Sequence, residues 1–343
     1  MCLRIYEEVY TQLRHSETGA GTKLGEMLPL DLPFAVLRVT LTARERVDLP
    51  PFPGSKLEGA FGRALYRLAC SQPHLDDCHA CPLRDICPYG LTYVPRLPPE
   101  VRASSLGTPP RPIVFRVPHE AERTLAPGED FAFDLTVAGA ALTQLPYLIA
   151  ALRAVGDEGL GRTRGRLELR QVESLNPYAN ESRVLTRGDE LGVNLAPLVL
   201  NVASLPEVRG ERVTLHFRSL THVQARGRMA EQLHFPVLLR ALQRRVTNLE
   251  QLYGGRSSLG ADFFALPYLA RSVATARHDL RPAHQARKGY RPHERAVMHG
   301  LLGTLTFEGN LAPFSALLRY GEHLGVGKWA HFGAGTYSVQ EHV

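Results

Sequence analysis

The stretch Gly325-Val326-Gly327-Lys328-Trp329-Ala330-His331-Phe332-Gly333-Ala334-Gly335 lies between a predicted amphipathic helix at Leu311–Leu324 and a final strand at Thr336–Gln340. Glycine adopts positive φ without strain and lets the backbone come close to whatever it touches. Lys328, Trp329 and His331 add a positive charge, an aromatic face and a titratable ring. We call residues 325–335 the second glycine loop.

An earlier stretch has the same character. Gly156-Asp157-Glu158-Gly159-Leu160-Gly161-Arg162-Thr163-Arg164-Gly165, the first glycine loop, follows a predicted helix with Leu142, Leu145, Ile149 and Leu152 on one face and precedes a strand at Arg166–Glu173. Two such loops at matching places indicate one structural unit that is used twice.

The order of elements in the first half supports this interpretation. Ser55 and Glu58 have capping-box spacing and predict a helix whose apolar face continues to Leu68. Strands are predicted at 36–42, 113–117, 131–137 and 166–173 from their patterning. The resulting order, βαββαβ, is the ferredoxin-like or RRM-like arrangement.

The second half repeats the order, with strands at 212–218 and 301–307, a helix opened by Pro236, and the helix and strand around the second glycine loop; residues 271–295 read as a loosely patterned basic stretch. We therefore predict an α+β protein of two tandem ferredoxin-like domains. The predicted limits are an N-terminal extension at 1–34, a first domain at 35–175 with a Cys- and Pro-rich insertion at 71–129, a linker at 176–210 and a second domain at 211–343. The linker region can equally be read as a small hairpin.

Composition indicates a globular protein with a basic surface that can bind an acidic partner. Of the 343 residues, 44% are hydrophobic and 22% charged, and no apolar run approaches the ~20 residues that cross a bilayer. The net charge is +6, and 36 of the 40 basic residues are arginine. Arginine suits phosphate binding and base stacking, although codon bias or thermal adaptation gives the same composition. We expect a cytoplasmic protein with no membrane partner.

Several motifs together resemble a known family. They are Pro53–Gly62, Arg245–Tyr253, Gly300–Phe307 and Gly325–Tyr337. The first of them, with the two glycine loops, resembles the RAMP superfamily of CRISPR proteins. The other three look like its repeat-RNA processing endoribonuclease, the sixth of the numbered Cas proteins, and the resemblance spans about residues 35–340.

This resemblance implies a protein that binds the repeat of precursor CRISPR RNA and stays with the mature crRNA or with other Cas effector subunits. It also implies cleavage without a catalytic metal, leaving a 5′-hydroxyl and a 2′,3′-cyclic phosphate. Side-chain-poor loops and arginines suit phosphates, and aromatic rings suit splayed bases. The candidate RNA-binding residues are Gly161, Arg162, Arg164, Arg166, Arg226, Arg228, Gly325, Gly327, Lys328, Trp329, His331, Gly333 and Gly335. The alternative is that the glycines only permit tight packing.

Cleavage by an internal 2′-hydroxyl needs a base, an acid and a cation. Members of the family often place a histidine on or near the first helix, but this chain has none between His15 and His74. The candidates on that helix are Lys56, Arg63 and Tyr66. His222, in the basic segment that also holds Arg226 and Arg228, is the fourth candidate.

The cysteines Cys70, Cys78, Cys81 and Cys87 are spaced x7, x2 and x5, the last three within the insertion and Cys70 directly before it. Such a cluster in a cytosolic protein favours a metal site over disulfides. We predict a structural zinc ion with four thiolate ligands, with an iron–sulfur cluster as the competing interpretation.

Two further functions fit the same sequence. The chain could be a non-catalytic RAMP subunit that binds RNA within a CRISPR effector complex. It could also be a zinc-stabilised nucleic-acid-binding module outside CRISPR.

Overall fold

A computed structural model describes residues 30–75, 77–97, 109–117, 123–188, 190, 195–255, 261–288 and 295–342. The predicted N-terminal extension lies almost wholly outside these residues.

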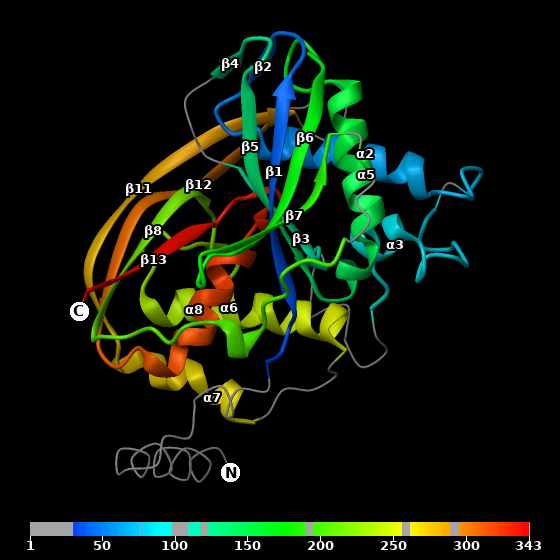
Figure 1. The fold of residues 1–343 in the computed structure, drawn as a ribbon. Helices are drawn as coiled ribbons and strands as arrows, with labels where there is room; N and C mark the ends of the chain where they lie inside the picture. The colour runs from blue at the N-terminus through cyan, green and yellow to red at the C-terminus, as the bar shows by residue number, and fades with distance from the viewer. Residues whose placement is uncertain are drawn as a thin grey trace.

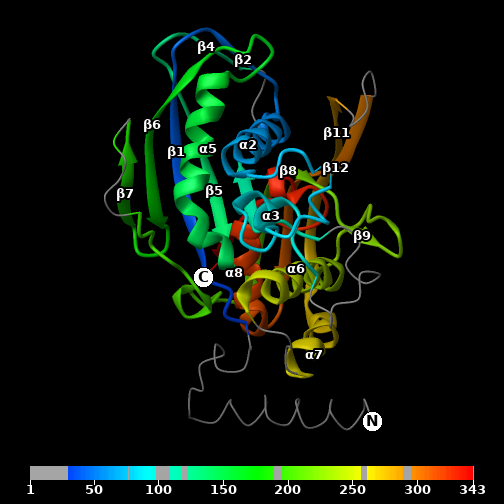
Figure 2. The ribbon, with the colours of Figure 1, turned by 90° about the vertical axis from the view of Figure 1, so that its right-hand side faces the viewer.

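The first sheet is antiparallel throughout, with the strand order β3-β5-β1-β6-β7. Without β7 this is the order of a ferredoxin-like sheet, because the fourth and third strands of the βαββαβ unit flank the first. The strands are β1 (Phe34–Ala43), β3 (Ile113–Arg116), β5 (Asp130–Ala138), β6 (Leu167–Asn176) and β7 (Glu181–Arg187). Two helices, α2 (Gly54–Ala69) and α5 (Leu145–Glu158), cover one face of this sheet (Figure 2).

The second sheet repeats the arrangement with the order β11-β12-β8-β13, again antiparallel. Its strands are β8 (Arg212–Thr221), β11 (Ala274–Lys288), β12 (Arg295–Glu308) and β13 (Tyr337–His342). The helices α6 (Phe235–Leu249) and α8 (Ser315–Leu324) pack beside it, with the short α7 (Ala261–Leu269) at one end (Figure 1). The chain is therefore a tandem α+β fold, as predicted. The exact domain limits, 35–175 and 211–343, stay a prediction.

Strand β1 joins the two halves because its two faces belong to different cores. Ala35, Leu37 and Val39 pack with α2 and α5 in the first core. Phe34 and Val36, on the opposite face, pack in the second core with residues of α6 and α8. This is why the strand is nearly continuously buried at its start instead of alternating.

The helix that follows β1 starts differently from the prediction. Its N-cap is Pro53 and no side chain caps it, so the predicted capping box of Ser55 and Glu58 is wrong. Glu58 is instead engaged by Arg111, in the segment before β3. The apolar spacing still places Leu57, Phe61, Ala64 and Leu65 in the core, because it encodes the buried face and not the cap.

Other strands lie where sequence reasoning gave no strand limits. Within the predicted linker, β7 pairs with β6 as a fifth strand. The basic stretch at 271–295 contains β11, which pairs with β12 from Ala274 to Lys288. The insertion contains a short helix, α3 (Pro88–Tyr93), and β4 (Arg123–Leu125), which pairs with β2 (Val47–Leu49). β11 lacks apolar alternation because it is an edge strand of the sheet, and of its residues 274–286 only Leu280 is buried.

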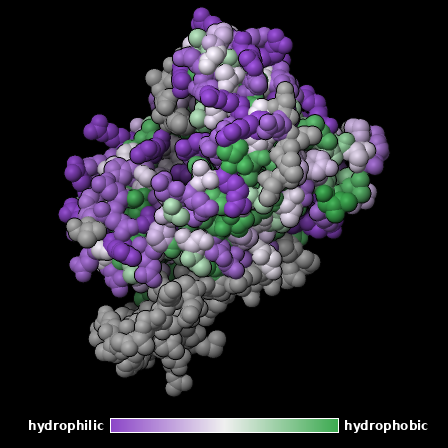
Figure 3. All heavy atoms as spheres, viewed as in Figure 1, coloured by the Kyte–Doolittle hydropathy of each residue, from purple (hydrophilic) through white to green (hydrophobic). Residues whose placement is uncertain are grey.

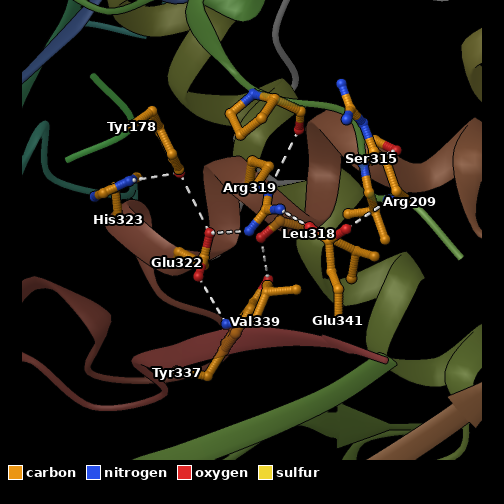
Figure 4. Close-up of polar contacts among 12 residues, drawn as sticks. Tyr178, Arg209, Ser315, Leu318, Arg319, Glu322, His323, Tyr337, Val339 and Glu341 are labelled. Carbon is orange, nitrogen blue, oxygen red and sulfur yellow. Dashed lines mark hydrogen bonds and ion pairs between the residues drawn. The ribbon is translucent and has the colours of Figure 1, made fainter. Parts of the chain in front are cut away.

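A buried polar network ties helix α8 to the first half of the chain (Figure 4). The guanidinium of Arg319 pairs with Glu322 at 3.1 Å and with Glu341 on β13. Tyr178, in the turn after β6, donates its hydroxyl hydrogen to Glu322 at 3.2 Å and lies 2.9 Å from Nε2 of His323. Because that hydroxyl hydrogen goes to Glu322, Nε2 of His323 donates to the tyrosine oxygen.

His323 is neutral in this network. Its Nδ1 accepts from Arg116 of β3 at 3.3 Å, so no site is left for a second proton. Burial, together with the charges of Arg116 and Arg319, holds the pKa of His323 well below its usual value.

We expect stability to fall on acidification because of this residue. The unfolded chain takes up a proton at His323 near the ordinary histidine pKa of about 6.5, whereas the folded chain does not. Stabilisation is therefore complete above that pH and is lost as the pH falls below it. Thermal melts between pH 7.5 and 5 should show a steeper decline for the wild type than for His323→Leu. Parallel declines would contradict this role.

The surface seen in Figure 3 is mostly hydrophilic, with hydrophobic residues at the centre and at the right-hand edge. The right-hand patch overlies the cysteine-bearing segment, where Ile86 is 74% exposed. Of the helices in the described ranges, none combines the length and apolar character that a membrane span requires.

Candidate functional site

The second glycine loop lies where the two halves of the chain meet. A Cβ at Gly327 would overlap the backbone oxygen of His222, at the end of β8, and one at Gly333 would overlap that of Phe115 on β3. Both glycines have positive φ, at 83° and 96°. The loop also approaches the start of α2, since a Cβ on Gly54 would overlap the oxygen of Phe332. Glycine is therefore required here for close backbone packing between the halves.

A small apolar cluster supports this junction. Phe52, Leu220, Met298 and Phe332 come from four different segments and are buried together, and Trp329 packs against them. The rings of Phe52 and Phe332 meet edge to face at 6.3 Å. The first glycine of α2, the end of β8 and the second glycine loop are thus held in a fixed relation.

Trp329 and His222 form the polar and aromatic part of the site. Trp329 has a left-handed backbone, with φ 62° and ψ 17°, which is strained for a bulky residue. Its ring lies 5.0 Å from that of His222, edge to face. The backbone N–H of Lys328 donates to the carbonyl of His222 at 2.9 Å. The loop conformation therefore fixes Trp329 and Lys328 beside the histidine.

The tautomer of His222 follows from its partner. Nδ1 lies 2.7 Å from the backbone oxygen of His299 on β12, and a carbonyl only accepts, so Nδ1 carries the hydrogen. Nε2 then holds a free lone pair, is shielded from solvent and has no hydrogen-bond partner in the described part of the chain. Burial, with the charges of Lys328 and His299, lowers the pKa of His222. A neutral imidazole with an open Nε2 has the form that a general base needs.

Two more histidines approach this site and were missed by sequence reasoning. His299 supplies the carbonyl that orients His222, and His284 of β11 is its cross-strand partner, with rings 6.2 Å apart. The sequence feature that could have identified them is the histidine content of residues 274–299. It points to this site only once the register of β11 and β12 is known.

Arg226 and Arg228 follow His222 in a two-stranded ribbon, β9 (Gln224–Ala225) and β10 (Arg228–Met229). Arg226 and Gly227 both have positive φ, at 49° and 79°, as in the type I′ turns that join tight hairpins. Both arginines are exposed. They follow His222 by four and six residues in the sequence.

The three candidates on α2 are separated. Lys56 is exposed in the first turn of the helix, two residues after Gly54. Arg63 and Tyr66 lie nine and twelve residues beyond Gly54, about 13 and 18 Å along the helix axis. They line a different groove with Tyr89, Tyr93 and Arg111.

The first glycine loop has other neighbours. Its backbone packs on β2, where a Cβ at Gly161 would overlap the oxygen of Asp48, and the N–H of Arg162 donates to the same oxygen at 3.0 Å. Arg162, Arg164 and Arg166 are all exposed. Arg166 pairs with Glu45 at 2.8 Å. The glycines here serve packing on β2, while the arginines face outward.

In the second glycine loop, Gly325, Gly333 and Gly335 are buried, whereas Lys328 is exposed and Gly327, Trp329 and His331 are partly exposed. Any contact with a ligand therefore falls on the middle of the loop. The buried glycines act through packing.

The four clustered cysteines, Cys70, Cys78, Cys81 and Cys87, are free thiols that line one small pocket next to Tyr66 and Tyr89. Burial and the charges of the other three cysteines raise the pKa of Cys78. Across the described ranges, however, no three Cys, His, Asp or Glu side chains form a group that could hold a metal ion. The donor chemistry fits zinc, but the positions of the thiols do not support the zinc prediction.

Comparison with known families divides the chain at the same place as the two sheets. Residues 215–337 match the family model of the CRISPR-associated endoribonuclease Cas6. Residues 32–197 match a model described as an N-terminal domain. An uncharacterized protein of Archaeoglobus fulgidus is 26% identical over 319 residues, which is 90% of this chain and 99% of that protein.

Solved structures share the fold at low identity. A Cas6 product complex superposes with a TM-score of 0.54 at 18% identity, covering 90% of this chain and all of that one. Thermus thermophilus Cas6 superposes with a TM-score of 0.50 at 16% identity, covering 94% of this chain and all of that one. A partial Cas6-RT-Cas1–Cas2 complex gives 0.53 at 12%, covering 92% of this chain and 47% of that one.

Proposed function

We propose that this chain, whose residues 215–337 match the family model of the CRISPR-associated endoribonuclease Cas6, belongs to that family and cleaves precursor CRISPR RNA within the repeat. The observation that carries the proposal is His222. It lies inside the matched domain, beside the second glycine loop, with Nε2 free to take a proton.

In the proposed reaction Nε2 of His222 removes the proton of a ribose 2′-hydroxyl. The 2′-oxygen then bonds to the adjacent phosphorus, and the bond from phosphorus to the 5′-oxygen breaks. The 5′-oxygen leaves with a proton from a general acid, giving a 5′-hydroxyl and a 2′,3′-cyclic phosphate. Lys328, whose charge already acts on His222, would offset charge on the phosphorane, and Lys56, exposed in the first turn of α2, is our second candidate for this role.

In this proposal Trp329 controls the access of the RNA to the general base, His222. Nε2 is shielded from solvent while the Trp329 ring packs against the imidazole. The ring therefore has to move before the 2′-hydroxyl arrives, and it then offers a stacking face to a base, the usual mode for single-stranded RNA.

RNA binding is proposed for the exposed cations around the junction and for the arginines of the first glycine loop. In the second loop the contacting residues are Gly327, Lys328, Trp329 and His331, with Arg226 and Arg228 on the adjacent ribbon. The exposure of these side chains supports the assignment.

Incubation with repeat RNA in EDTA tests the function. Scission at one site with the two end groups named above supports the endoribonuclease. Tight binding without scission would favour the alternative of a non-catalytic RAMP subunit. If the protein neither binds nor cleaves the repeat RNA, the remaining hypothesis is a nucleic-acid-binding module outside CRISPR.

Charge reversal on the first glycine loop tests its part in binding. Arg162→Glu with Arg164→Glu should weaken repeat-RNA binding at least tenfold, because two cations are replaced by two anions. The melting temperature should change little, since both side chains are exposed. An unchanged Kd would show that the loop is purely structural.

Partners besides RNA are proposed from the solved complexes. One relative of this fold is part of a Cas6-RT-Cas1–Cas2 assembly. We infer that this chain also meets other Cas proteins, and co-purification with its genomic neighbours tests the inference.

A structural zinc ion remains a proposal for the cysteine pocket. Its support is that Cys70, Cys78, Cys81 and Cys87 line one pocket and act on each other electrostatically, although their present positions form no ligand group. Small movements in this short segment would be needed to reach the Zn–S distance of about 2.3 Å.

Metal analysis of the purified full chain checks this. We expect about one zinc per chain, reduced in Cys78→Ser with Cys81→Ser. Iron in place of zinc would indicate an iron–sulfur cluster. If the protein contains neither metal, the proposal is overturned.

A further inference from the structure

A groove on helix α2, separate from the histidine site, combines three tyrosines with three arginines. Its volume is about 550 Å³. We call it the tyrosine groove; it is lined by Glu58, Gly59, Gly62, Arg63, Tyr66, Arg67, Tyr89, Tyr93 and Arg111.

The walls of the groove are aromatic. Tyr89 and Tyr93 of α3 stack in parallel, with centroids 5.0 Å apart and planes 3° apart. Tyr66 of α2 meets Tyr89 edge to face at 5.1 Å. All three rings are partly exposed, so they extend an aromatic surface along the groove.

The floor of the groove is α2 itself, where Gly59 and Gly62 leave the helix surface without side chains. A Cβ at Gly62 would lie 2.8 Å from the ring of Tyr93, so glycine is required for the ring to approach the helix. The hydroxyl of Tyr93 donates to the backbone oxygen of Glu58 at 3.2 Å, and the guanidinium of Arg111 lies 4.3 Å from the centre of its ring. The aromatic wall is therefore held in place before any ligand binds.

One positive charge in the groove has no partner. Arg111 is engaged by Glu58, and Arg67 by Glu158. Arg63 is exposed and makes no hydrogen bond or ion pair within the described ranges. A cation without a counter-charge next to stacked aromatic rings matches the chemistry of a nucleotide, a phosphate joined to a flat base.

We propose that the tyrosine groove binds one unpaired nucleotide of the RNA substrate, with its base against the tyrosines and its phosphate on Arg63. This rests on the proposed function and adds to it a second contact point away from the cleavage site. Arg63 is about 13 Å along α2 from the glycine that meets the second glycine loop. About four stacked nucleotides span that distance, so one strand can reach both places.

This placement gives the cysteine-bearing insertion a role in RNA recognition. The insertion contributes Tyr89 and Tyr93, and the cysteine pocket shares Tyr66 and Tyr89 with the groove. The insertion therefore shapes the aromatic wall.

The test compares Arg63→Glu with Arg187→Glu, an exposed arginine at the end of β7, at the opposite edge of the first sheet from β3. Repeat RNA from the CRISPR array of the same genome is titrated in EDTA at several salt concentrations. Arg63→Glu should raise the Kd about tenfold, and Arg63→Gln should lower the slope of log K against log salt by about 0.7. Arg187→Glu should leave both unchanged.

A set of repeat RNAs with single abasic sites locates the base. One position a few nucleotides from the scissile phosphate should weaken wild-type binding about tenfold and have no further effect in Tyr89→Leu. Circular dichroism melts confirm that each variant is folded, and Arg63→Gln replaces Arg63→Glu if the latter melts early.

The outcomes separate the two proposals. If the wild type cleaves the repeat and the Arg63 variants bind it equally well, the groove inference is overturned and the nuclease stands. If the wild type neither binds nor cleaves, both fall. Arg63 variants that keep RNA binding but lose a Cas protein partner would make the groove a protein interface, which also overturns the inference.

Discussion

Replacing His222 with alanine should reduce single-turnover cleavage of repeat RNA by about 10²- to 10⁴-fold, the usual contribution of a general base. Among the buried polar side-chain atoms of the described residues that lack a hydrogen-bond partner, Nε2 of His222 is the only imidazole nitrogen. RNA affinity should change little, because Lys328 and the neighbouring arginines remain. Quenched-flow cleavage at saturating enzyme measures the rate, and a filter-binding titration measures the Kd.

The matched control is His216→Ala on the same strand. His216 is hydrogen-bonded to Gln340 at 2.6 Å and takes no part in the site, so its loss should leave the rate within about twofold. The wild-type rate should rise with pH and level off below the ordinary histidine pKa, because the pKa of His222 is lowered and the neutral form is the active one. Equal rates for His222→Ala and the wild type would overturn the assignment of the base.

Replacing Arg319 with alanine should lower the unfolding free energy by about 3 kcal/mol, the cost of leaving two partly buried carboxylates without their partner. The Arg319 side chain is 8% exposed and holds both Glu322 and Glu341. Because Tyr178 and His323 depend on the same network (Figure 4), the contact between the halves should loosen as well. The expected fall in melting temperature is about 5–10 °C.

Arg212→Ala is the control for this second prediction. Arg212 pairs with Glu308 at 3.3 Å, but the two side chains are 51% and 45% exposed. A surface pair of this kind contributes at most about 1 kcal/mol. If Arg319→Ala and Arg212→Ala have the same melting temperature, the network does not stabilise the fold as proposed.

The two βαββαβ units were predictable because local patterns encode them. Apolar spacing identified α2, α5, α6 and the central strands, and the two glycine loops marked equivalent positions. The resemblance quoted from Pro53–Gly62 and Gly325–Tyr337 pointed to the family whose model matches residues 215–337. β11 was missed and β7 was covered only by the expectation of a linker or small hairpin, because an edge strand needs little alternation.

What the sequence by itself determined is therefore the order of elements, the arginine-rich composition and the glycine loops, because periodicity and glycine content act over a few residues. Only the tertiary structure decided which side chains share a site. The β8–β12 pairing and the loop bring His299 and Trp329 to His222, whereas Arg63 and Tyr66, on the same helix as Lys56, face a different groove. These juxtapositions depend on strand register and helix rise across residues far apart in the chain, and no local pattern specifies them.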